Sequence, residues 1–330
     1  MVEKVKVSVI VTAYNEGNNI IKCLNSLKNQ VGQSEYEVLI VDDGSTDNSV
    51  TIMNKYVAEN HNFRVIHKSN GGSITGRYTG AVYANGEYIT FVDADDFVCS
   101  NYIKKVYDII ENEDKDLYFL NNKINKINSS TFFIEKNFIK NDALLSLDTA
   151  YDWVLTGKAG AVWDKIYKRN IFIDSLKNNL SHIFYGEDVY INSLYLTKVK
   201  SIVSFDTAIY YHYIDSPTSG SNTQKNFKKI DDINNLYKLI RNLKSNISEN
   251  NFNNFENLYI SQIANVVGYL VEFGMKSKGI KNHIQNLEII NEALYEVHPN
   301  SKVKWLYVFC LKHRLFRFLS LINIIKKQKK

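Results

Sequence analysis

The chain contains few cysteines and prolines for its 330 residues, three of the first and two of the second. Cys23, Cys99 and Cys310 show no pairable or metal-ligand spacing, which excludes a disulfide-stapled fold and a cysteine-ligated metal site. We expect all three to be reduced and buried in a cytoplasmic protein. Because the first strand is expected to begin by about Val5, we also expect no signal peptide. A hydrophobic fraction of 45% excludes a disordered or collagen-like chain.

The sequence also lacks a run of eighteen apolar residues, so it predicts no membrane-spanning helix. Its excess of basic charge lies at one end. Residues 301–330 hold nine of the 40 lysines and arginines and no acid, whereas residues 1–300 carry a net charge of −4. A net negative charge over residues 1–300 is not typical of a general nucleic-acid binder. For residues 303–330 two interpretations stay open: a closing helix that packs on the rest of the chain, or an amphipathic helix at the surface of an anionic membrane.

The first hundred residues alternate short β-branched apolar runs with helical periodicity. We expect strands at about 5–12, 37–41, 63–67 and 88–92, and helices at about 18–29, 47–56 and 74–84. Ser45 or Thr46 is the expected cap of the second helix. Such alternation is typical of an α/β fold with a mostly parallel, Rossmann-like sheet covered by helices on both faces.

Beyond residue 100 the alternation becomes irregular. Ser100 is the expected cap of a helix that ends at Asn112, a strand follows at 117–120, and residues 121–140 are expected to form a loop or hairpin. A helix at 185–198 and a strand-rich segment at 202–213 come next, and the pattern is helical from Phe227 onward. We therefore expect a first domain at 1–224, with halves at about 1–100 and 101–224, and a helical C-terminal region at 225–330.

Acidic side chains follow three of the expected strands: Glu16 follows the first, Asp42, Asp43 and Asp47 the second, and Asp93, Asp95 and Asp96 the fourth. In parallel sheets, ligands bind beyond the carboxyl ends of the strands, so these side chains are expected to meet at one edge. Carboxylates gathered there would repel one another, and a divalent cation is the simplest way to balance them. Asp93 and Asp95 are two residues apart at a strand end, so both can face one cation.

Each of these motifs also has a purely structural interpretation. Asp-rich turns cap helices, and Asp188 with Glu187 fits the acidic first turn of a helix as well as it fits a general base. Gly72, Gly76 and Gly80 are four apart, which predicts a smooth helix face packed on the sheet. No Gly-Lys-Ser/Thr follows them and no Gly-x-Gly follows the first strand, so the sequence has neither a P-loop nor a dinucleotide fingerprint. Arg77, in the same helix, either balances the acidic edge or is solvated.

Taken together, six segments resemble the family 2 glycosyltransferases, which have the GT-A fold. They are VSVIVTAYNE, VLIVDDGSTDNS, NGGSITGR, GEYITFVDADD, VWDKIYKR and GEDVYIN, in family order over about the first 190 residues. The resemblance implies an inverting enzyme with a nucleotide-diphosphate sugar donor, most often a UDP-sugar, and Mn²⁺ or Mg²⁺ as cofactor. It assigns residues 1–100 to the nucleotide-sugar and 101–224 to the acceptor, a glycan or lipid-linked glycan of a bacterial surface polysaccharide.

The resemblance also implies the site residues, carried over position by position. Thr12, Ala13, Tyr14 and Glu16 would border the nucleoside, Asp43 rather than Asp42 would hold the uracil, and Arg77 would lie beside the nucleotide. Asp93 and Asp95 match the DXD motif, with Asp93 near the ribose and the metal and Asp95 as the metal ligand. Asp188 would be the general base, and Glu187 would orient the acceptor or the sugar.

The chain departs from the family pattern at several positions. Many members have proline where Ala13 stands and asparagine where Tyr78 stands. After the aromatic strand, many members place an arginine and then serines on the diphosphate. Ser219 and Ser221 are present here, but the arginine is absent, and His212 or a lysine such as Lys225 is the candidate to replace it.

Two other functions fit the sequence less well. A catalytically silent subunit that binds nucleotide-sugars would use the same fold, but the intact acidic set favours an enzyme. A nucleotidyltransferase would need a Gly-rich basic loop after the first strand, and Ala13 to Glu16 provide none. We expect a cytoplasmic protein, either dissolved or held on the inner face of the cell membrane by residues 303–330.

Overall fold

The computed structural model describes residues 5–32, 35–125, 133–136, 138–213 and 226–328, which form two compact units. The first unit consists of Met1–Ala150, Ala159–His182 and Leu194–Asn222, and the second of Tyr151–Lys158, Ile183–Ser193 and Thr223–Lys330. The predicted domain boundary between residues 224 and 225 lies outside the described residues.

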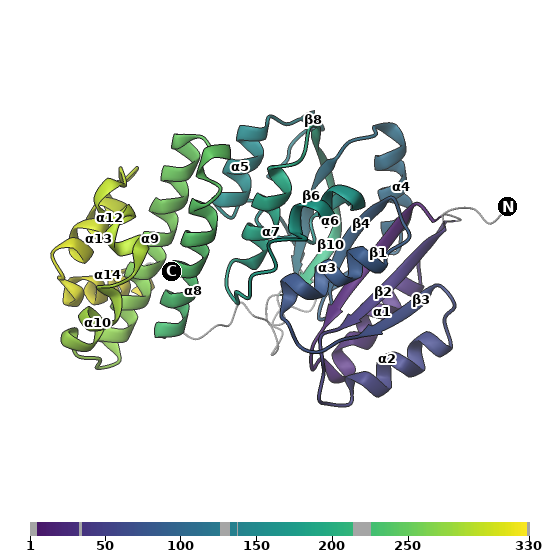
Figure 1. The fold of residues 1–330 in the computed structure, drawn as a ribbon, viewed down its shortest axis with the longest axis horizontal. Helices are drawn as coiled ribbons and strands as arrows, with labels where there is room; N and C mark the ends of the chain where they lie inside the picture. Colours follow the sequence, from purple (N-terminus) through teal and green to yellow (C-terminus); the bar gives the residue numbers. More distant parts are fainter. Residues whose placement is uncertain (1–4, 33–34, 126–132, 137, 214–225, 329–330) are drawn as a thin grey trace. The chain divides into compact units, whose positions relative to one another are not determined.

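The first unit is built on one sheet, several strands of which are labelled in Figure 1. The strand order is β3-β2-β1-β4-β9-β6-β10-β5, with β7 beside β6 and β8 beside β10. The strands are β1 (Val7–Ala13), β2 (Tyr36–Asp42), β3 (Phe63–His67), β4 (Tyr88–Asp93), β5 (Phe97–Val98), β6 (Leu117–Asn125), β7 (Phe133–Lys136), β8 (Ala143–Leu144), β9 (Lys165–Lys168) and β10 (Ile202–Tyr213). Strands β3, β2, β1 and β4 are parallel, and antiparallel pairs enter with β9. The predicted α/β fold is confirmed, and its sheet is mixed beyond β4.

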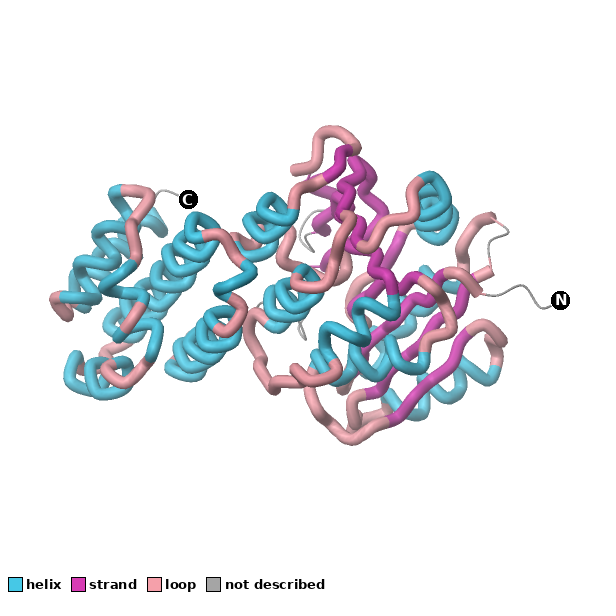
Figure 2. The backbone as a smooth tube through the Cα atoms, turned by 45° about the horizontal axis from the view of Figure 1, so that its top comes forward, coloured by secondary structure: helices cyan, strands magenta, loops and turns pink. Residues whose placement is uncertain are grey.

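Helices cover both faces of this sheet (Figure 2). On one face, Val7, Val9 and Val11 of β1 share a buried core with apolar side chains of α1 (Ile20–Lys28), α2 (Ser49–Ala58) and α4 (Tyr102–Asn112). The opposite face carries α3 (Ser73–Tyr83) and α6 (Arg169–Leu176), where Phe91 of β4 packs against Phe172 with ring centroids 5.0 Å apart. Val7, Val9 and Val11 thus face one core, whereas Ile10 of the same strand faces Gly80 of α3 on the other side of the sheet, as the alternation along a strand predicts. A 3₁₀ turn, η1 (Gly17–Asn19), and α5 (Leu147–Leu155) complete the helices that begin in this unit.

Three details at helix ends and strand ends differ from the expectations. The predicted cap of α2 is wrong: the helix begins after Asn48, and Asp47 Oδ1 accepts the hydrogen bond from the Ser49 amide at 3.0 Å. Helix α4 begins after Asn101 instead of Ser100. The strand expected at 117–120 extends to Asn125 because it pairs with β7. This antiparallel pair is the hairpin, which was one of the two alternatives expected for residues 121–140.

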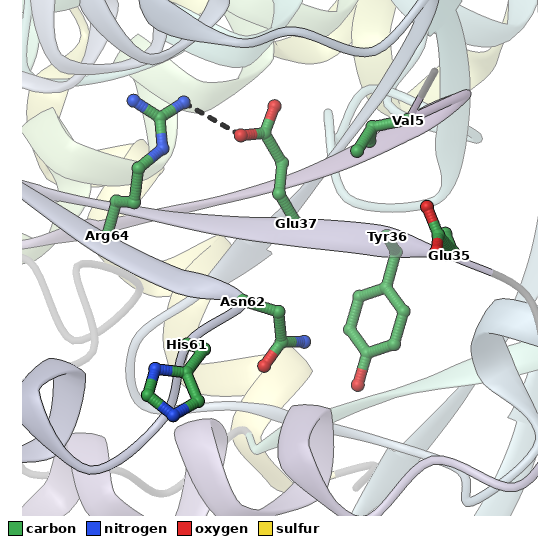
Figure 3. Close-up of a pocket in the computed structure, with 7 residues that line it drawn as sticks. All are labelled: Val5, Glu35, Tyr36, Glu37, His61, Asn62 and Arg64. Carbon is green, nitrogen blue, oxygen red and sulfur yellow. Dashed lines mark hydrogen bonds and ion pairs between the residues drawn. The ribbon is translucent and has the colours of Figure 1, made fainter. Parts of the chain in front are cut away.

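Glu37 holds the amino ends of the first strands together. Its carboxylate accepts hydrogen bonds from Ser8 Oγ at 2.6 Å and from the Asn85 amide at 2.6 Å. It also accepts from Arg64 Nη2 at 2.7 Å, the contact that Figure 3 shows. Burial alone would raise the pKa of Glu37, but these donors outweigh it and lower the pKa. Glu37 and Arg64 line a pocket of about 420 Å³ at this edge with Val5, Glu35, Tyr36, His61 and Asn62. The pocket is thus at the edge opposite the acidic loops, and its buried carboxylate serves the fold.

The second unit is helical and is organised around the long helix α9 (Glu249–Glu272). Its other helices are α8 (Phe227–Arg241), α10 (Ser277–Ile284), α11 (Glu288–Asn291), α12 (Ala293–Glu296), α13 (Lys302–Lys312) and α14 (Phe316–Gln328), with a 3₁₀ turn η3 (Lys244–Asn246) and most of α7 (Glu187–Leu196). Asn226, Ser248 and Ser301 cap α8, α9 and α13 with side-chain hydrogen bonds, as polar N-cap residues typically do.

The basic C-terminal segment forms α13 and α14, which pack on α9 with one face and expose the other. Tyr307, Leu311 and Leu319 are buried, whereas Trp305 and Phe318 are exposed by 56% and 57%. The segment therefore packs on the helical unit, as one interpretation predicted, and still presents apolar side chains. None of the helices in the described part of the chain has the length and apolar character needed to cross a membrane.

The glycines of α3 give a test of the sheet packing. A Cβ on Gly80 would lie 2.4 Å from Ile10 Cγ2 and 3.2 Å from Val41 Cγ2, whereas a Cβ on Gly76 would approach Thr12 Cγ2 only to 3.4 Å. We expect Gly80→Ala to lower the free energy of unfolding by about 1–3 kcal/mol, because overpacking outweighs the gain in helix propensity. Gly76→Ala in the same helix is the control, with a change near zero or slightly stabilising. Urea denaturation checks both; equal effects would contradict the close contact.

Candidate active site

Three loops meet at the carboxyl edge of the parallel strands. The register pairs Ala13 of β1 with Asp42 of β2 and Thr12 with Asp93 of β4. The Asp43 amide then donates to the Ala13 carbonyl at 2.9 Å, which holds the loop after β2 against the loop after β1. The structure thus brings together most of the residues predicted for the nucleotide: Thr12, Ala13, Asp43, Arg77, Asp93 and Asp95, with Tyr14 and Glu16 in the loop that follows β1.

Asn15 shapes the loop after β1, and the sequence analysis missed it. Its φ of 55° is left-handed, a conformation that asparagine tolerates better than most residues. Its amide donates to Ser45 Oγ at 3.0 Å, and its side-chain oxygen accepts from the Thr46 amide at 2.8 Å. Next to it, Tyr14 is 47% exposed. Ser45 and Thr46 therefore fix Asn15 instead of capping α2, and the loop presents Tyr14 to the solvent at the site edge.

Asp43 is enclosed by the loop that leads into α3. Its carboxylate accepts from the amides of Gly71 at 3.0 Å and Gly72 at 2.7 Å, and from the ammonium of Lys68. Gly72 has φ 84°, which a residue with a side chain would rarely adopt, so glycine is required where the chain enters the helix. Lys68 was not predicted. The carboxylate has about four acceptor positions, so it can accept a further hydrogen bond in addition to these three.

Arg77 balances the acidic edge, which was one of its two predicted roles. Its Nη2 donates to Asp93 Oδ1 at 3.1 Å, and the arginine is only 4% exposed. Asp93 is less buried, with a side chain that is 28% exposed. The pair joins α3 to the end of β4, so the buried guanidinium fixes the position of the Asp93 carboxylate.

Asp93 and Asp95 are also the residues that would hold a cation. No group of three or more His, Cys, Asp and Glu side chains in the described part of the chain could bind a metal by itself. Mg²⁺ and related ions are often held by one or two carboxylates, with water and substrate phosphates as the other ligands. Two half-buried aspartates at a strand end fit a cation shared with a bound diphosphate, not an independent metal centre.

The last aspartate of this loop, Asp96, is fully buried against Tyr210 of β10. Tyr210 Oη donates to Asp96 Oδ2 at 2.6 Å and accepts from the Asp93 amide at 3.0 Å. Burial, and then the neighbouring carboxylates of Asp96 and Asp93, raise the pKa of Tyr210, so the phenol keeps its proton. Asp96 was predicted to lie among the carboxylates of the acidic edge, whereas Tyr210 was given no role from the sequence.

Glu187 and Asp188 belong to the second unit, where they form the first turn of α7. Gly186 precedes them with φ 78°, and a Cβ there would lie 2.4 Å from Leu236 Cδ2 of α8. The glycine therefore lets the start of α7 approach α8 closely. A carboxylate in the first turn is stabilised by the helix dipole, and Asp188 is half-buried there. Its role as a general base stays a prediction.

The predicted diphosphate contacts are only partly within the described residues. His212 lies in β10, where its backbone pairs with Ile124 of β6. Ser219, Ser221 and Lys225 lie outside the described residues. All four assignments, that of His212 included, stay predictions.

Acidic loops at the carboxyl edge of the parallel strands, with Asp93 and Asp95 where β4 ends, are typical of the ligand-binding edge of α/β proteins. The model of the family described as "Glycosyl transferase family 2" matches residues 8–178, more than half of the chain. The chain therefore belongs to glycosyltransferase family 2, as the resemblance predicted.

Relatives with curated names agree with this assignment. Glycosyltransferase GlyG of Streptococcus pneumoniae is 38% identical over 34% of this chain and 37% of its own length. The uncharacterized glycosyltransferase YibD of Escherichia coli is 30% identical over 63% of this chain and 61% of its own. The poly(ribitol-phosphate) beta-glucosyltransferase of Bacillus spizizenii is 31% identical over 62% and 32%. The chain thus spans between about a third and three fifths of the length of these relatives.

A solved structure shows the same fold over nearly the whole chain. Residues 1–349 of Staphylococcus aureus TarS, crystallised with UDP-GlcNAc, superpose with a TM-score of 0.70 at 21% identity, covering 98% of this chain and 92% of that one. The predicted GT-A fold with a helical C-terminal region is therefore confirmed.

Substitutions of Arg77 and Asp93 test whether their ion pair balances the negative charge at the carboxyl edge of the sheet. Asp93→Asn removes the carboxylate beside a guanidinium that is the more buried partner, so we expect it to lower the free energy of unfolding by about 2–4 kcal/mol. Arg77→Met leaves a carboxylate that reaches solvent and should cost less. The double variant should recover part of the loss. Urea denaturation of the four proteins measures the coupling, and strictly additive losses would contradict a direct pair.

Proposed function

We propose that the protein is an inverting glycosyltransferase that moves a sugar from a UDP-sugar to a hydroxyl group of a glycan or lipid-linked glycan. The observation that carries the proposal is the carboxyl edge of β1, β2 and β4, where Asp43 and Asp93 are held by donors from the segment 68–77. The TarS structure with UDP-GlcNAc, which shares the fold, supports a nucleotide-sugar as the donor class.

Donor binding is assigned to the first unit. An ionised Asp43 accepts hydrogen bonds and donates none, so it suits the imide N–H of uracil. Thr12, Ala13, Tyr14 and Glu16 would border the nucleoside, and Arg77 would act beside the nucleotide through Asp93. Asp95, with Asp93 directly or through water, would hold Mn²⁺ or Mg²⁺, which neutralises charge on the departing diphosphate. His212, Ser219 and Ser221 remain the proposed diphosphate contacts.

Transfer is assigned to Asp188 in the first turn of α7. Its carboxylate takes the proton of the acceptor hydroxyl while that oxygen forms a bond to the anomeric carbon. The bond from the anomeric carbon to the β-phosphate oxygen breaks on the opposite face, and its electron pair leaves with UDP. A single displacement inverts the anomeric configuration and needs no covalent nucleophile. Glu187 would orient the acceptor or the sugar.

The acceptor is proposed to be part of a bacterial surface polysaccharide. The support is the curated name of one relative, a poly(ribitol-phosphate) beta-glucosyltransferase, which shares 31% identity over 62% of this chain. The two other relatives named above carry no acceptor in their names.

The division of labour between donor binding and transfer can be tested with two variants. Asp188→Asn keeps the shape but removes the base, so we expect UDP binding to stay within about twofold while transfer falls by 10²-fold or more. Asp95→Ala should lose metal-dependent UDP binding. Asp108→Asn, an exposed aspartate paired with Lys104, is the control and should leave both unchanged. Calorimetry with UDP and Mn²⁺ measures binding, and UDP release from UDP-sugars with Mn²⁺ measures turnover.

Two outcomes would contradict the proposal. Unchanged turnover in Asp188→Asn would remove the base assignment. UDP binding by the wild type, with neither hydrolysis nor transfer of any UDP-sugar tested, would favour a silent nucleotide-sugar-binding subunit.

We also propose that the enzyme acts on the inner face of the cell membrane, held there by residues 303–330. Val303, Trp305 and Leu306 of α13, and Phe318, Leu321 and Ile324 of α14, are exposed. Residues 301–330 contain nine basic residues and no acid. Exposed aromatic rings next to lysines and arginines suit the headgroup region of an anionic bilayer, where each basic residue contributes about 1 kcal/mol.

Vesicle binding tests this placement. We expect the protein to co-sediment with phosphatidylglycerol vesicles at low salt and to be released as salt rises, because the attraction is screened. Trp305→Ser with Phe318→Ser should weaken binding at least tenfold. Tyr83→Ser, which removes a similarly exposed ring from α3, should leave it unchanged. Equal binding by all three proteins, or none by the wild type, would refute membrane attachment through α13 and α14.

A further inference from the structure

We infer that Tyr210 is a positioning residue for the donor site, because its hydroxyl sets the shape of the Asp93–Asp96 loop through Asp96 and the Asp93 amide. The inference rests on the proposed function, in which Asp93 and Asp95 act on the donor and its metal. Tyr210 itself is assigned no contact with the substrate.

The hydroxyl of Tyr210 is bonded to both ends of the loop. It accepts from the Asp93 amide at 3.0 Å and donates to Asp96 Oδ2 at 2.6 Å. The Asp96 amide also donates to the Asp93 carbonyl at 3.0 Å, which closes the turn. Asp95 lies inside this turn, so the direction of its carboxylate depends on a loop that Tyr210 holds at both ends. Tyr210 and Asp96 are 1% and 0% exposed, so water does not compete for these bonds.

A stacking contact on the face of its ring holds Tyr210 in place. The indole of Trp163 stacks on it, with centroids 4.5 Å apart and planes 12° apart. The turn that carries Trp163 is held by Lys165, whose buried ammonium donates to the carbonyls of Ala159 at 2.8 Å and Ala161 at 2.6 Å. The VWDKIYKR segment thus braces the tyrosine that orients the DXD loop. This gives a physical role to Trp163 and Lys165, which the sequence analysis left without one.

A second buried tyrosine provides a matched control. Tyr195 Oη accepts from the Lys168 amide at 2.9 Å and donates to the Asp116 carbonyl, at the amino end of β6 and away from the acidic loops. Its ring packs edge-on against Tyr167 with centroids 5.0 Å apart. Tyr195→Phe and Tyr210→Phe therefore each remove one buried hydroxyl with two partners, and comparable losses of thermal stability are expected from both.

The experiment compares these two variants with the wild type by hydrogen exchange and by calorimetry with UDP and Mn²⁺. We expect Tyr210→Phe to speed exchange of the amides from Asp93 to Phe97, and to weaken Mn²⁺-dependent UDP binding about tenfold or more, as loss of a supporting hydrogen bond does at metal sites. Tyr195→Phe should leave both readouts near wild type. Unchanged exchange at residues 93–97 in Tyr210→Phe, or an equal binding defect in Tyr195→Phe, would overturn the inference.

The two readouts separate this inference from the proposed function. If Tyr210→Phe speeds exchange at residues 93–97 but the wild-type protein itself binds no UDP, Tyr210 keeps its role in positioning the loop and the assignment of this edge to the donor is rejected. Asp96→Asn keeps an oxygen that can accept from the tyrosine, so it should lose less binding than Tyr210→Phe. A larger loss of UDP binding in Asp96→Asn than in Tyr210→Phe would show that binding depends on the Asp96 carboxylate more than on the Tyr210 hydroxyl. That result would also overturn the inference.

Discussion

The site depends on the crowding of carboxylates where β1, β2 and β4 end. The sequence predicts a divalent cation as the simplest way to balance them, and the protein also supplies donors of its own. Asp42 lies 2.8 Å from the His67 ring, Asp43 accepts from Lys68, Asp93 from Arg77 and Asp96 from Tyr210. The partners come from the end of β3, from α3 and from β10, so the acidic edge can form only when the sheet and α3 are in place.

The need to hold these carboxylates together explains residues that take no part in the proposed reaction. Gly80 lets α3 lie directly on β1, which brings Arg77 of the same helix under Asp93. Gly72 enters α3 with a positive φ and turns its amide toward Asp43. At the opposite edge, Glu37 holds the amino ends of the strands and the turn before β4. Glycine packing and a buried glutamate therefore set the geometry on which the aspartates depend.

Much of the first hundred residues could be predicted because their signals are local. The strand at 63–67 and the acidic loops follow from short apolar runs and the residues just after them. Tyr210 could not be predicted, since its hydroxyl bonds Asp96 across 114 residues and no local pattern marks that pairing. Lys68 and Asn15 were missed for a similar reason: each acts on another loop. The roles of Asp188, His212, Ser219 and Ser221 remain predictions based on family resemblance.

The most direct test of the account is a crystal structure of the protein with UDP and Mn²⁺. The account predicts the uracil beside Asp43, the diphosphate at the carboxyl ends of β1 and β4, and the metal on Asp95. Arg77 should keep its bond to Asp93, and Tyr210 its bonds to the loop. Nucleotide bound elsewhere, such as in the pocket beside Glu37 and Arg64, or a metal that avoids both Asp93 and Asp95, would contradict it.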